Sequence, residues 1–225
     1  MTSENCFCFI ACVNDPIFFE ECKLYISLLH IPNGYSVNIL SVTDAASMAA
    51  GYNEGMTASN AKYKIYLHQD TFIVDRYLLY EILDIFGSDD SIGMIGAVGS
   101  LSVPSDGCMW NSDRIWCTYH DDVRNTAGCD KYYTLGSYDI AYVKIIDGLL
   151  IITNHDISWR EDIFMDFDFY DASQSMEFAK QGYRIVVPRF DKPICVHDDG
   201  GILELINYNA NRLKFLREYM TSQEV

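Results

Sequence analysis

The sequence predicts an α/β fold with a mainly parallel central sheet flanked by helices, and three observations support this. Strand-like apolar runs alternate with helix-like segments over residues 1–98, at the spacing of βαβ units, whose strands are parallel. Similar patterns resume from Tyr138 onward. The 225 residues suit one large domain, and 49% of them are hydrophobic, which is enough for a sizeable core. We therefore expect residues 1–225 to form a single domain.

The elements of the first half are separated by turn residues. The apolar run Cys6–Val13 predicts a buried strand, and Asn14 or Asp15 caps the following helix, with Pro16 in its first turn. The later patterns predict strands over Tyr35–Val42, Lys62–Leu67 and Ile92–Val98, and helices over Ala45–Ala58 and Asp75–Phe86. The helix Ala45–Ala58 is rich in small residues, so we expect it to pack closely against the sheet.

The second half begins with an irregular segment. Residues 100–136 lack a clear period and carry Trp110 and Trp116, a pattern typical of a functional loop, although aromatic residues that simply fill the core fit it equally. Beyond it, the patterns predict strands over Tyr138–Ile152, interrupted at Asp147-Gly148, and over Tyr183–Pro188, and helices over Asp171–Gln181 and Ile202–Met220.

Two helices carry apolar stripes that we expect to be buried. In the helix after the first strand, the stripe consists of Ile17, Leu24 and Leu28. In the last helix, the predicted apolar face consists of Ile206, Leu213, Leu216 and Met220.

The charge of the chain excludes several classes of partner. With 32 acidic and 16 basic side chains, the formal net charge is −16. Nucleic acids and anionic membrane surfaces are bound by clustered Lys and Arg, so neither is an expected partner. The polar start lacks the features of a secretory signal, and no apolar stretch is long enough for a membrane span. We expect a cytoplasmic protein.

The eight cysteines are expected to be free thiols in such a compartment. Four residues of the irregular segment offer an alternative, a zinc site. They are Cys108, Cys117, His120 and Cys129. Only Cys117 and His120 have a familiar ligand spacing, so free thiols remain the preferred interpretation.

Polar residues follow several of the predicted strands. In parallel sheets, ligands bind where the strands end at their carboxyl edge, which points to Asn14, Asp44 and the triplet His68-Gln69-Asp70. The glycines Gly93, Gly96 and Gly99 do not have the spacing of a dinucleotide fingerprint, so we assign them to packing and turns.

Three acidic or imidazole residues beside predicted strand ends could bind a divalent metal ion. Asp70 follows the third strand, Asp171 opens a helix, and His197 follows the last strand. Carboxylate and imidazole together suit Mn²⁺, and carboxylate with diphosphate oxygens suits Mg²⁺. Each residue also fits a plainer interpretation, because Asp is common in turns and helix caps, and His197 lies in a Gly-rich segment.

Taken in order, these segments resemble the small GT-A glycosyltransferases related to glycosyltransferase family two. The resemblance extends from Phe7 to about Tyr219. Its pieces are Ala11-Cys12-Val13-Asn14, Ser47-Met48-Ala49-Ala50-Gly51-Tyr52-Asn53, Tyr63-Lys64-Ile65-Tyr66-Leu67-His68-Gln69-Asp70, Ile146-Asp147-Gly148, Phe169-Tyr170-Asp171, Gly182-Tyr183-Arg184-Ile185 and Val196-His197. It implies that residues 1–98 form a nucleotide-binding half and that residues 99–225 complete the acceptor and metal sites.

The resemblance also implies residues for the nucleotide. The end of the first strand would lie beside the base, which assigns Cys12, Val13 and Asn14 to that contact. Asp44 would lie near the base or ribose, and Asn53 would line the same pocket.

The metal and catalytic positions follow from the same resemblance. Asp70 matches the last Asp of an Asp-x-Asp motif that binds the metal on the diphosphate, and His197 matches a late histidine that completes the site. Asp171 matches the catalytic base, with Asp168 as the reserve choice. His68 replaces the usual first Asp, so it either contacts ribose or metal, or marks weakened metal binding or a different donor.

The implied reaction is transfer of a sugar from a UDP- or GDP-sugar to a carbohydrate or other hydroxyl acceptor, with inversion and with Mn²⁺ or Mg²⁺. A divalent cation stabilises the charge of the leaving diphosphate, and a carboxylate takes the proton of the acceptor hydroxyl. Two alternatives remain. One is a nucleotidyltransferase, although no Gly-rich phosphate loop with a basic residue follows the first strand. The other is a non-catalytic nucleotide-sugar or carbohydrate-binding module on the same fold.

Overall fold

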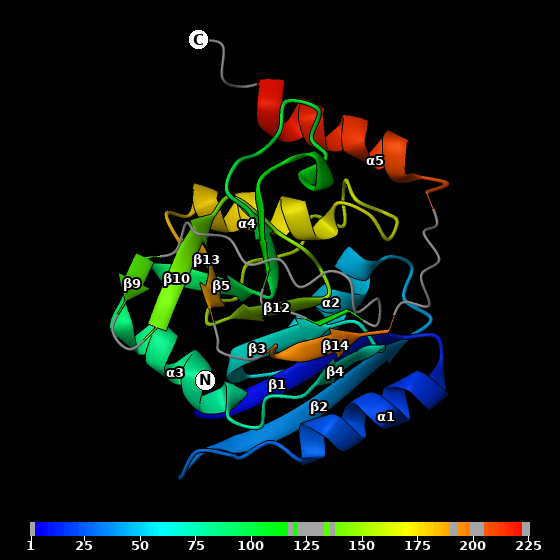
Figure 1. Ribbon diagram of the computed structural model, residues 1–225. Helices are drawn as coiled ribbons and strands as arrows, with labels where there is room; N and C mark the ends of the chain where they lie inside the picture. Colours follow the sequence, from blue (N-terminus) through cyan, green and yellow to red (C-terminus); the bar gives the residue numbers. More distant parts are fainter. Residues whose placement is uncertain are drawn as a thin grey trace.

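A mixed eight-stranded sheet forms the centre of the molecule (Figure 1). The computed structural model describes residues 3–116, 119–120, 133–135, 138–189, 193–198 and 205–221. In spatial order the strands of the sheet are β2 (Ser36–Thr43), β1 (Ser3–Val13), β3 (Ala61–Leu67), β12 (Leu150–Thr153), β5 (Ile92–Gly96), β13 (Arg184–Arg189), β10 (Tyr138–Val143) and β9 (Tyr133–Leu135). Strands from the two halves of the sequence therefore share one sheet and interleave at its centre, where β12 lies between β3 and β5.

The predicted α/β class is confirmed, with one difference in strand direction. β1 is parallel to β2 and β3, and β13 is parallel to β5. β12, however, lies antiparallel between β3 and β5, and β10 is antiparallel to β13. No helix leads into β12, which follows β11 (Ile145–Ile146) after a short turn. A helical crossover is what normally returns a chain to the parallel direction, so its absence allows the antiparallel insertion.

Two three-stranded sheets flank the central one. The first contains β11, β6 (Val98–Ser100) and β7 (Arg114–Trp116). The second contains β4 (Thr71–Ile73), β14 (Cys195–His197) and β8 (Tyr119–His120). Because β14 pairs antiparallel with β4, a segment near the end of the chain lies beside the corner that follows β3.

Helices cover both faces of the central sheet (Figure 1). They are α1 (Pro16–Ser27), α2 (Met48–Ala58), α3 (Leu78–Ser88), α4 (Tyr170–Lys180) and α5 (Tyr208–Phe215), which continues into a π-helical segment, Leu216–Met220. Successive side chains of β1 point to opposite faces. Phe7 and Phe9 are buried in a cluster with residues of α1 and α3, whereas Cys8 and Ile10 are buried with residues of α2 and α4. Within the described part of the chain, no helix is both long and apolar enough to cross a membrane.

The close packing predicted for the small-residue helix is confirmed. A Cβ added at Gly51 would overlap Cys12 of β1, and one added at Gly55 would overlap Ile10. The packing role of Gly96 is also confirmed, since a Cβ there would lie 2.6 Å from Cγ2 of Ile146. Only glycine leaves room for these neighbours.

The predicted buried stripe of the first helix is wrong. Ile17, Leu24 and Leu28 are exposed, by 80%, 58% and 45%. The residues that α1 buries are Phe19, Cys22 and Ile26. Both faces of this helix carry apolar residues, so helical spacing alone selects two equally good stripes.

The predicted face of the last helix is also wrong. Helix α5 begins at Tyr208, Ile206 before it is 81% exposed, and Leu213 is 39% exposed. Its buried residues are Asn211, Phe215 and, in the π-helical segment, Tyr219. A polar residue on the inward face and the change of helical pitch after Phe215 both break the apolar pattern that the sequence prediction used.

Candidate functional site

Three polar side chains from distant parts of the chain meet at the corner where β3 ends. His68 and Asp70 follow β3 directly, and His197 is the last residue of β14. The pairing of His197 with Thr71 and a hydrogen bond from the Asp198 amide to the Asp70 carbonyl, 3.0 Å, hold the two segments together. The structure thus places Asp70 and His197 side by side and adds His68 to them.

The potential ligand atoms of this cluster lie close together. Nδ1 of His68 is 3.2 Å from Nε2 of His197, which is 3.3 Å from Oδ1 of Asp70. One ligand atom from each residue lies within 4.8 Å of the other two. The Asp70 side chain is 22% exposed, and its Oδ1 is buried in contact with His197. Two imidazoles and a buried carboxylate oxygen therefore lie close enough together to share one ion.

These spacings fit a divalent cation. Ligands at right angles around an ion, with bonds of ~2.1 Å, lie ~3 Å apart, close to the observed separations. Burial alone would raise the pKa of Asp70, but contact with His197 and the charge of His68 outweigh it, so the pKa is lowered. Asp70 is therefore a carboxylate at neutral pH, as a metal ligand must be.

A cavity of about 560 Å³ lies on one side of the cluster, at the carboxyl ends of β1 and β2. Its lining includes Cys12, Val13, Asn14 and Asp44, four of the residues that the resemblance assigns to the nucleotide, together with His68. We call this space the donor-side cavity.

Gln69 connects this cavity to the cluster. Its Oε1 accepts hydrogen bonds from the amides of Asn14, 2.9 Å, and Asp15, 2.8 Å, while its Nε2 donates to the Asn14 side chain. The end of β1 is thereby fixed to the residue between His68 and Asp70. The position within a polar triplet was the only sequence signal for Gln69, and it did not indicate this contact.

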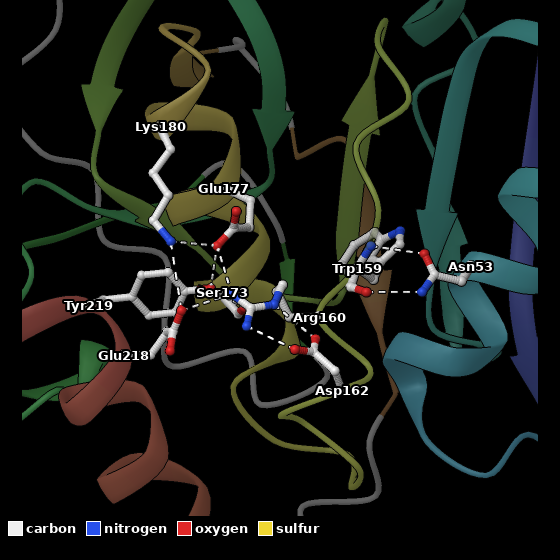
Figure 2. A network of polar contacts seen from close by, with 9 residues as sticks. All are labelled: Asn53, Trp159, Arg160, Asp162, Ser173, Glu177, Lys180, Glu218 and Tyr219. Atoms are coloured by element: carbon white, nitrogen blue, oxygen red, sulfur yellow. Dashed lines mark hydrogen bonds and ion pairs between the residues drawn. The ribbon is translucent and has the colours of Figure 1, made fainter.

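Asn53 does not line the donor-side cavity. Its Nδ2 donates to the carbonyl of Trp159, 2.9 Å, and its Oδ1 accepts from the Trp159 amide, 2.8 Å (Figure 2). Both ends of this amide are engaged, as a bridge between α2 and the segment before α4. The structure therefore brings four of the five predicted residues from the first two βα units together and places Asn53 elsewhere.

A second cavity, of about 470 Å³, lies on the other side of the cluster. It is lined by Asp168 and Asp171 from the start of α4, by Trp110, and by His68 and His197. We call it the α4-side cavity. Trp110 is 42% exposed, and the guanidinium of Arg114 lies 4.9 Å from its ring centroid. The side chain of Trp116 lies outside the described residues.

The carboxylate of Asp171 is held by main-chain amides. Oδ2 accepts from Gly148, 2.9 Å, and Oδ1 from Ala172, 2.7 Å. Burial, and then the charge of Asp147, raise the pKa of Asp171 to about 7. Phe169, just before the helix, has a φ of 61°, a strained conformation of the type found at functional sites. Burial also raises the pKa of Asp168, with help from Asp166.

Tyr170 links the start of α4 to the cluster. Its hydroxyl lies 2.6 Å from Nε2 of His68, and its buried side chain packs against the rings of Tyr52 and Trp159. Sequence reasoning missed this contact, because a tyrosine before a helix carries no signal of its partner. Its position directly before Asp171 is the one hint in the sequence.

Comparison with known proteins identifies the family of the chain. The model of a family described as "Glycosyltransferase like family" matches residues 8–219. The chain belongs to this family. The family and the type of enzyme that the resemblance implied, a glycosyltransferase, are thereby supported, and no curated protein sequence matches the chain significantly.

Solved structures show that this glycosyltransferase-like chain has the GT-A fold. Residues 1–349 of S. aureus TarS superpose with a TM-score of 0.55 at 10% identity, covering 85% of this chain and 60% of that one. The UDP-GlcNAc complex of the same TarS fragment has a TM-score of 0.58 at 10% identity, with coverages of 94% and 66%. The mannosyltransferase PcManGT from Pyrobaculum calidifontis, in complex with GDP-Man and Mn²⁺, has a TM-score of 0.55 at 14% identity, with coverages of 86% and 56%. The chain thus spans between 56% and 66% of these structures.

An ion-pair network fixes the segment that carries Asp168 in this glycosyltransferase-like chain (Figure 2). Arg160 pairs with Asp162, 2.8 Å, with Glu218, 2.9 Å, and with Glu177 of α4, 3.4 Å. It therefore ties the segment before α4 to both α4 and the end of the chain. We call residues 154–169 the strap.

The four residues of the alternative zinc site lie largely outside the described residues of the glycosyltransferase-like chain. Cys117 and Cys129 are among the undescribed residues, as is the side chain of His120. Sγ of Cys108 accepts a hydrogen bond from the Tyr208 hydroxyl, 3.1 Å, at the wall of the α4-side cavity. The six described cysteines are free thiols.

Proposed function

We propose that this chain transfers a sugar from a UDP- or GDP-sugar to a hydroxyl acceptor, with inversion and with the help of Mn²⁺ or Mg²⁺. The family match supports the class of reaction, and the ligands of the two similar structures, UDP-GlcNAc in TarS and GDP-Man with Mn²⁺ in PcManGT, support the class of donor. Retention of configuration is the competing stereochemical outcome.

One observation carries the proposal: two cavities meet at a cluster with the composition of a metal site. The donor-side and α4-side cavities share His68 and Phe167 in their linings. A donor bound in the first would place its diphosphate at His68, Asp70 and His197, and its sugar toward the second. An acceptor in the second would then approach the sugar from the side of α4.

On the donor side, the chain supplies the ends of two parallel strands. Cys12 and Val13 end β1, Asn14 follows it, and Asp44 follows β2 with a φ of 57°. Ligands of open α/β sheets bind at such strand ends. We assign the base to the end of β1 and the ribose to Asp44, whose exposed carboxylate can accept hydrogen bonds from ribose hydroxyls.

At the junction, Asp70 and His197 would hold the divalent cation. When bound, the cation would supply Lewis-acid stabilisation of the charge that develops on the leaving diphosphate. The proximity of both imidazoles keeps Asp70 ionised for this role. Among the described residues that line the two cavities there is no lysine or arginine.

On the α4 side, we assign Asp171 as the base that accepts the proton of the acceptor hydroxyl. A pKa near the operating pH is best for a general base, and burial beside Asp147 gives Asp171 such a value, about 7. Its two hydrogen bonds from main-chain amides hold the carboxylate in one orientation. Asp168 lines the same cavity and is the second choice, and Trp110 offers a ring on which an acceptor sugar can stack.

The test is a thermal-shift titration followed by an assay of the released nucleotide. We expect UDP- or GDP-sugar with Mn²⁺ to raise the Tm, and the donor to release nucleoside diphosphate in the presence of acceptor or slowly to water. Asp70→Ala should abolish both. Asp90→Ala, at an exposed residue that lines neither cavity, is the matched control and should change neither.

Two results would contradict the proposal. The absence of stabilisation by any nucleotide or nucleotide-sugar would remove the donor assignment. Binding without release of nucleoside diphosphate under any condition would indicate a binding module on this fold.

A further inference from the structure

His68 occupies the position at which the resemblance leads us to expect an aspartate, and its ring is held on both sides. Nε2 is 2.6 Å from the hydroxyl of Tyr170, and Nδ1 is 3.2 Å from Nε2 of His197. One ring nitrogen therefore points into the protein, and the other points at the cluster with Asp70. This geometry is that of a metal ligand whose ring orientation is fixed by a partner on its other nitrogen, here Tyr170.

Tyr170 has little freedom to move away from His68. Its side chain is 4% exposed, and its ring lies against those of Tyr52, with centroids 5.8 Å apart, and Trp159, 6.1 Å. On the remaining side it touches Gly148 so closely that a Cβ there would overlap the hydroxyl. The hydroxyl is therefore a fixed partner for Nε2.

The fixed hydroxyl can accept a hydrogen bond from Nε2 of His68 or donate one to it, so both tautomers fit this contact. When Nε2 carries the proton and donates it to Tyr170, the lone pair of Nδ1 points toward His197 and Asp70. A metal-ligating histidine commonly donates its other ring N–H to such a partner, which orients the ring and raises its basicity. We propose that His68 is the third protein ligand of this site, through Nδ1, that Tyr170 is its positioning residue, and that the site prefers Mn²⁺ to Mg²⁺.

The preference follows from the donor atoms. Two imidazole nitrogens and one carboxylate oxygen form the set. Mg²⁺ takes oxygen ligands almost exclusively, whereas first-row transition ions accept imidazole readily. An Asp-x-Asp corner with one histidine would instead present two carboxylates, a set that suits Mg²⁺ better. The exchange of Asp for His at residue 68 therefore changes the choice of ion, and the inference rests on the proposed metal-dependent transfer.

The experiment measures metal binding directly on the full chain without donor. Binding of Mn²⁺ is followed by its electron paramagnetic resonance signal, and Mg²⁺ affinity is obtained by competition. We expect the wild-type chain to bind Mn²⁺ at least ~10-fold more tightly than Mg²⁺, as expected when nitrogen ligands replace oxygen. In His68→Asp, the ratio of the two dissociation constants should fall by ~10-fold or more.

The role of Tyr170 is tested by Tyr170→Phe, which removes only the hydroxyl. Loss of such an outer partner should weaken Mn²⁺ binding by ~10- to 100-fold. In the Co²⁺-loaded chain, the visible absorption bands should shift relative to wild type, a change that a purely structural role would not cause at unaltered Tm.

The chain offers a matched control pair. Tyr183 and His155 also form a tyrosine–histidine contact, 3.3 Å from hydroxyl to Nδ1, and neither lines the two cavities. Tyr183→Phe should leave Mn²⁺ affinity and the Co²⁺ spectrum unchanged. If Tyr170→Phe fails to fold, His68→Asp and the wild-type ion preference still decide the assignment.

The outcomes separate this inference from the proposed function. Equal affinity of the wild-type chain for the two ions, or an unchanged ratio in His68→Asp, overturns the assignment of His68. Tight and selective Mn²⁺ binding without stabilisation by any nucleotide-sugar leaves that assignment standing and removes the proposed donor. Transfer that proceeds equally well with Mg²⁺ and Mn²⁺ supports the proposed function and removes the preference.

Discussion

The two cavities that meet at His68 hold their polar groups in different ways. On the donor side, Asn14 and Asp44 are exposed residues of turns, and side-chain contacts with Gln69 fix the end of β1. On the α4 side, Asp171 and Asp168 are partly buried, and burial raises the pKa of both.

This difference fits the roles that we propose for the two cavities, donor binding on one side and proton transfer on the other. Groups that recognise a nucleotide need only present donors and acceptors, so exposed turns at strand ends are sufficient. A group that takes a proton must have a matched pKa and a fixed orientation, which burial and main-chain hydrogen bonds provide at a cost in stability. Changes on the α4 side should therefore reduce the rate of transfer, and changes on the donor side should weaken binding.

The largest effect is expected from Asp171→Asn. The amide cannot accept the proton of the acceptor hydroxyl, so transfer should fall by ~10²- to 10⁴-fold. The Kd for the nucleotide, measured by titration calorimetry, should not change, because Asp171 does not line the donor-side cavity.

Asp168→Asn is the matched variant for this prediction. It alters a second carboxyl group of the same cavity and should reduce transfer far less. A larger loss in Asp168→Asn than in Asp171→Asn would move the base from one residue to the other.

Two glycine substitutions compare the cavities through packing. Gly148→Ala would push Tyr170 away from His68, whereas Gly51→Ala would displace Cys12 in the donor-side wall. Each overpacks a tight contact, so each should lower the free energy of unfolding by about 1–3 kcal/mol. Gly148→Ala should also weaken Mn²⁺ binding, and Gly51→Ala should weaken nucleotide binding. If both variants weakened Mn²⁺ binding, or both weakened nucleotide binding, the two cavities would not act independently.

The pH dependence should differ between the two sides as well. Asp171 must be ionised to act as a base, so transfer should rise as pH increases toward about 7 and then level off. Asp147→Asn removes the neighbouring charge that raises this pKa and should shift the rise to lower pH. The measurement is kcat/KM between pH 5 and 8, with Asp75→Asn, remote from both cavities, as the control.

The same group affects stability with a defined sign. Its pKa in the folded chain lies above the usual value of an aspartate, so the folded state binds the proton more tightly than the unfolded state. The contribution of Asp171 to the free energy of unfolding therefore decreases as pH rises from about 4 to about 7. Urea denaturation of Asp171→Asn should show a weaker decrease over this range than wild type.

Sequence reasoning succeeded where a feature depends on strand ends and failed where it depends on direction or contact. Apolar runs located β1, β3 and β13, and polar residues after such runs pointed to the corner where Asp70 lies beside His197. The antiparallel direction of β12 was not predicted, because a short buried strand has the same apolar pattern in either direction.

Side-chain contacts between residues far apart in the sequence could not be predicted from the hydrophobic pattern. The bridge from Asn53 to Trp159 joins residues 106 apart, and the contact from His68 to Tyr170 joins residues 102 apart. Neither partner has a residue type that specifies the other. The resemblance supplied the order of the site residues, but the contact between the Tyr170 hydroxyl and Nε2 of His68 became visible only in the structure.

The smallest effect concerns the strap, which carries Asp168 on the α4 side. Arg160 is 25% exposed and pairs with three carboxylates, whereas Lys62 pairs with one carboxylate of the described residues, that of the exposed Glu4. Arg160→Met should therefore lower the free energy of unfolding by about 1–2 kcal/mol, and Lys62→Met by less than about 0.5 kcal/mol, since isolated surface pairs contribute little. Urea denaturation measures both values. Phe167 of the strap lines both cavities, whereas Asp168 lines only the α4-side cavity. We therefore expect Arg160→Met to reduce transfer more than nucleotide binding, and the opposite order would show that the two sides are coupled through this segment.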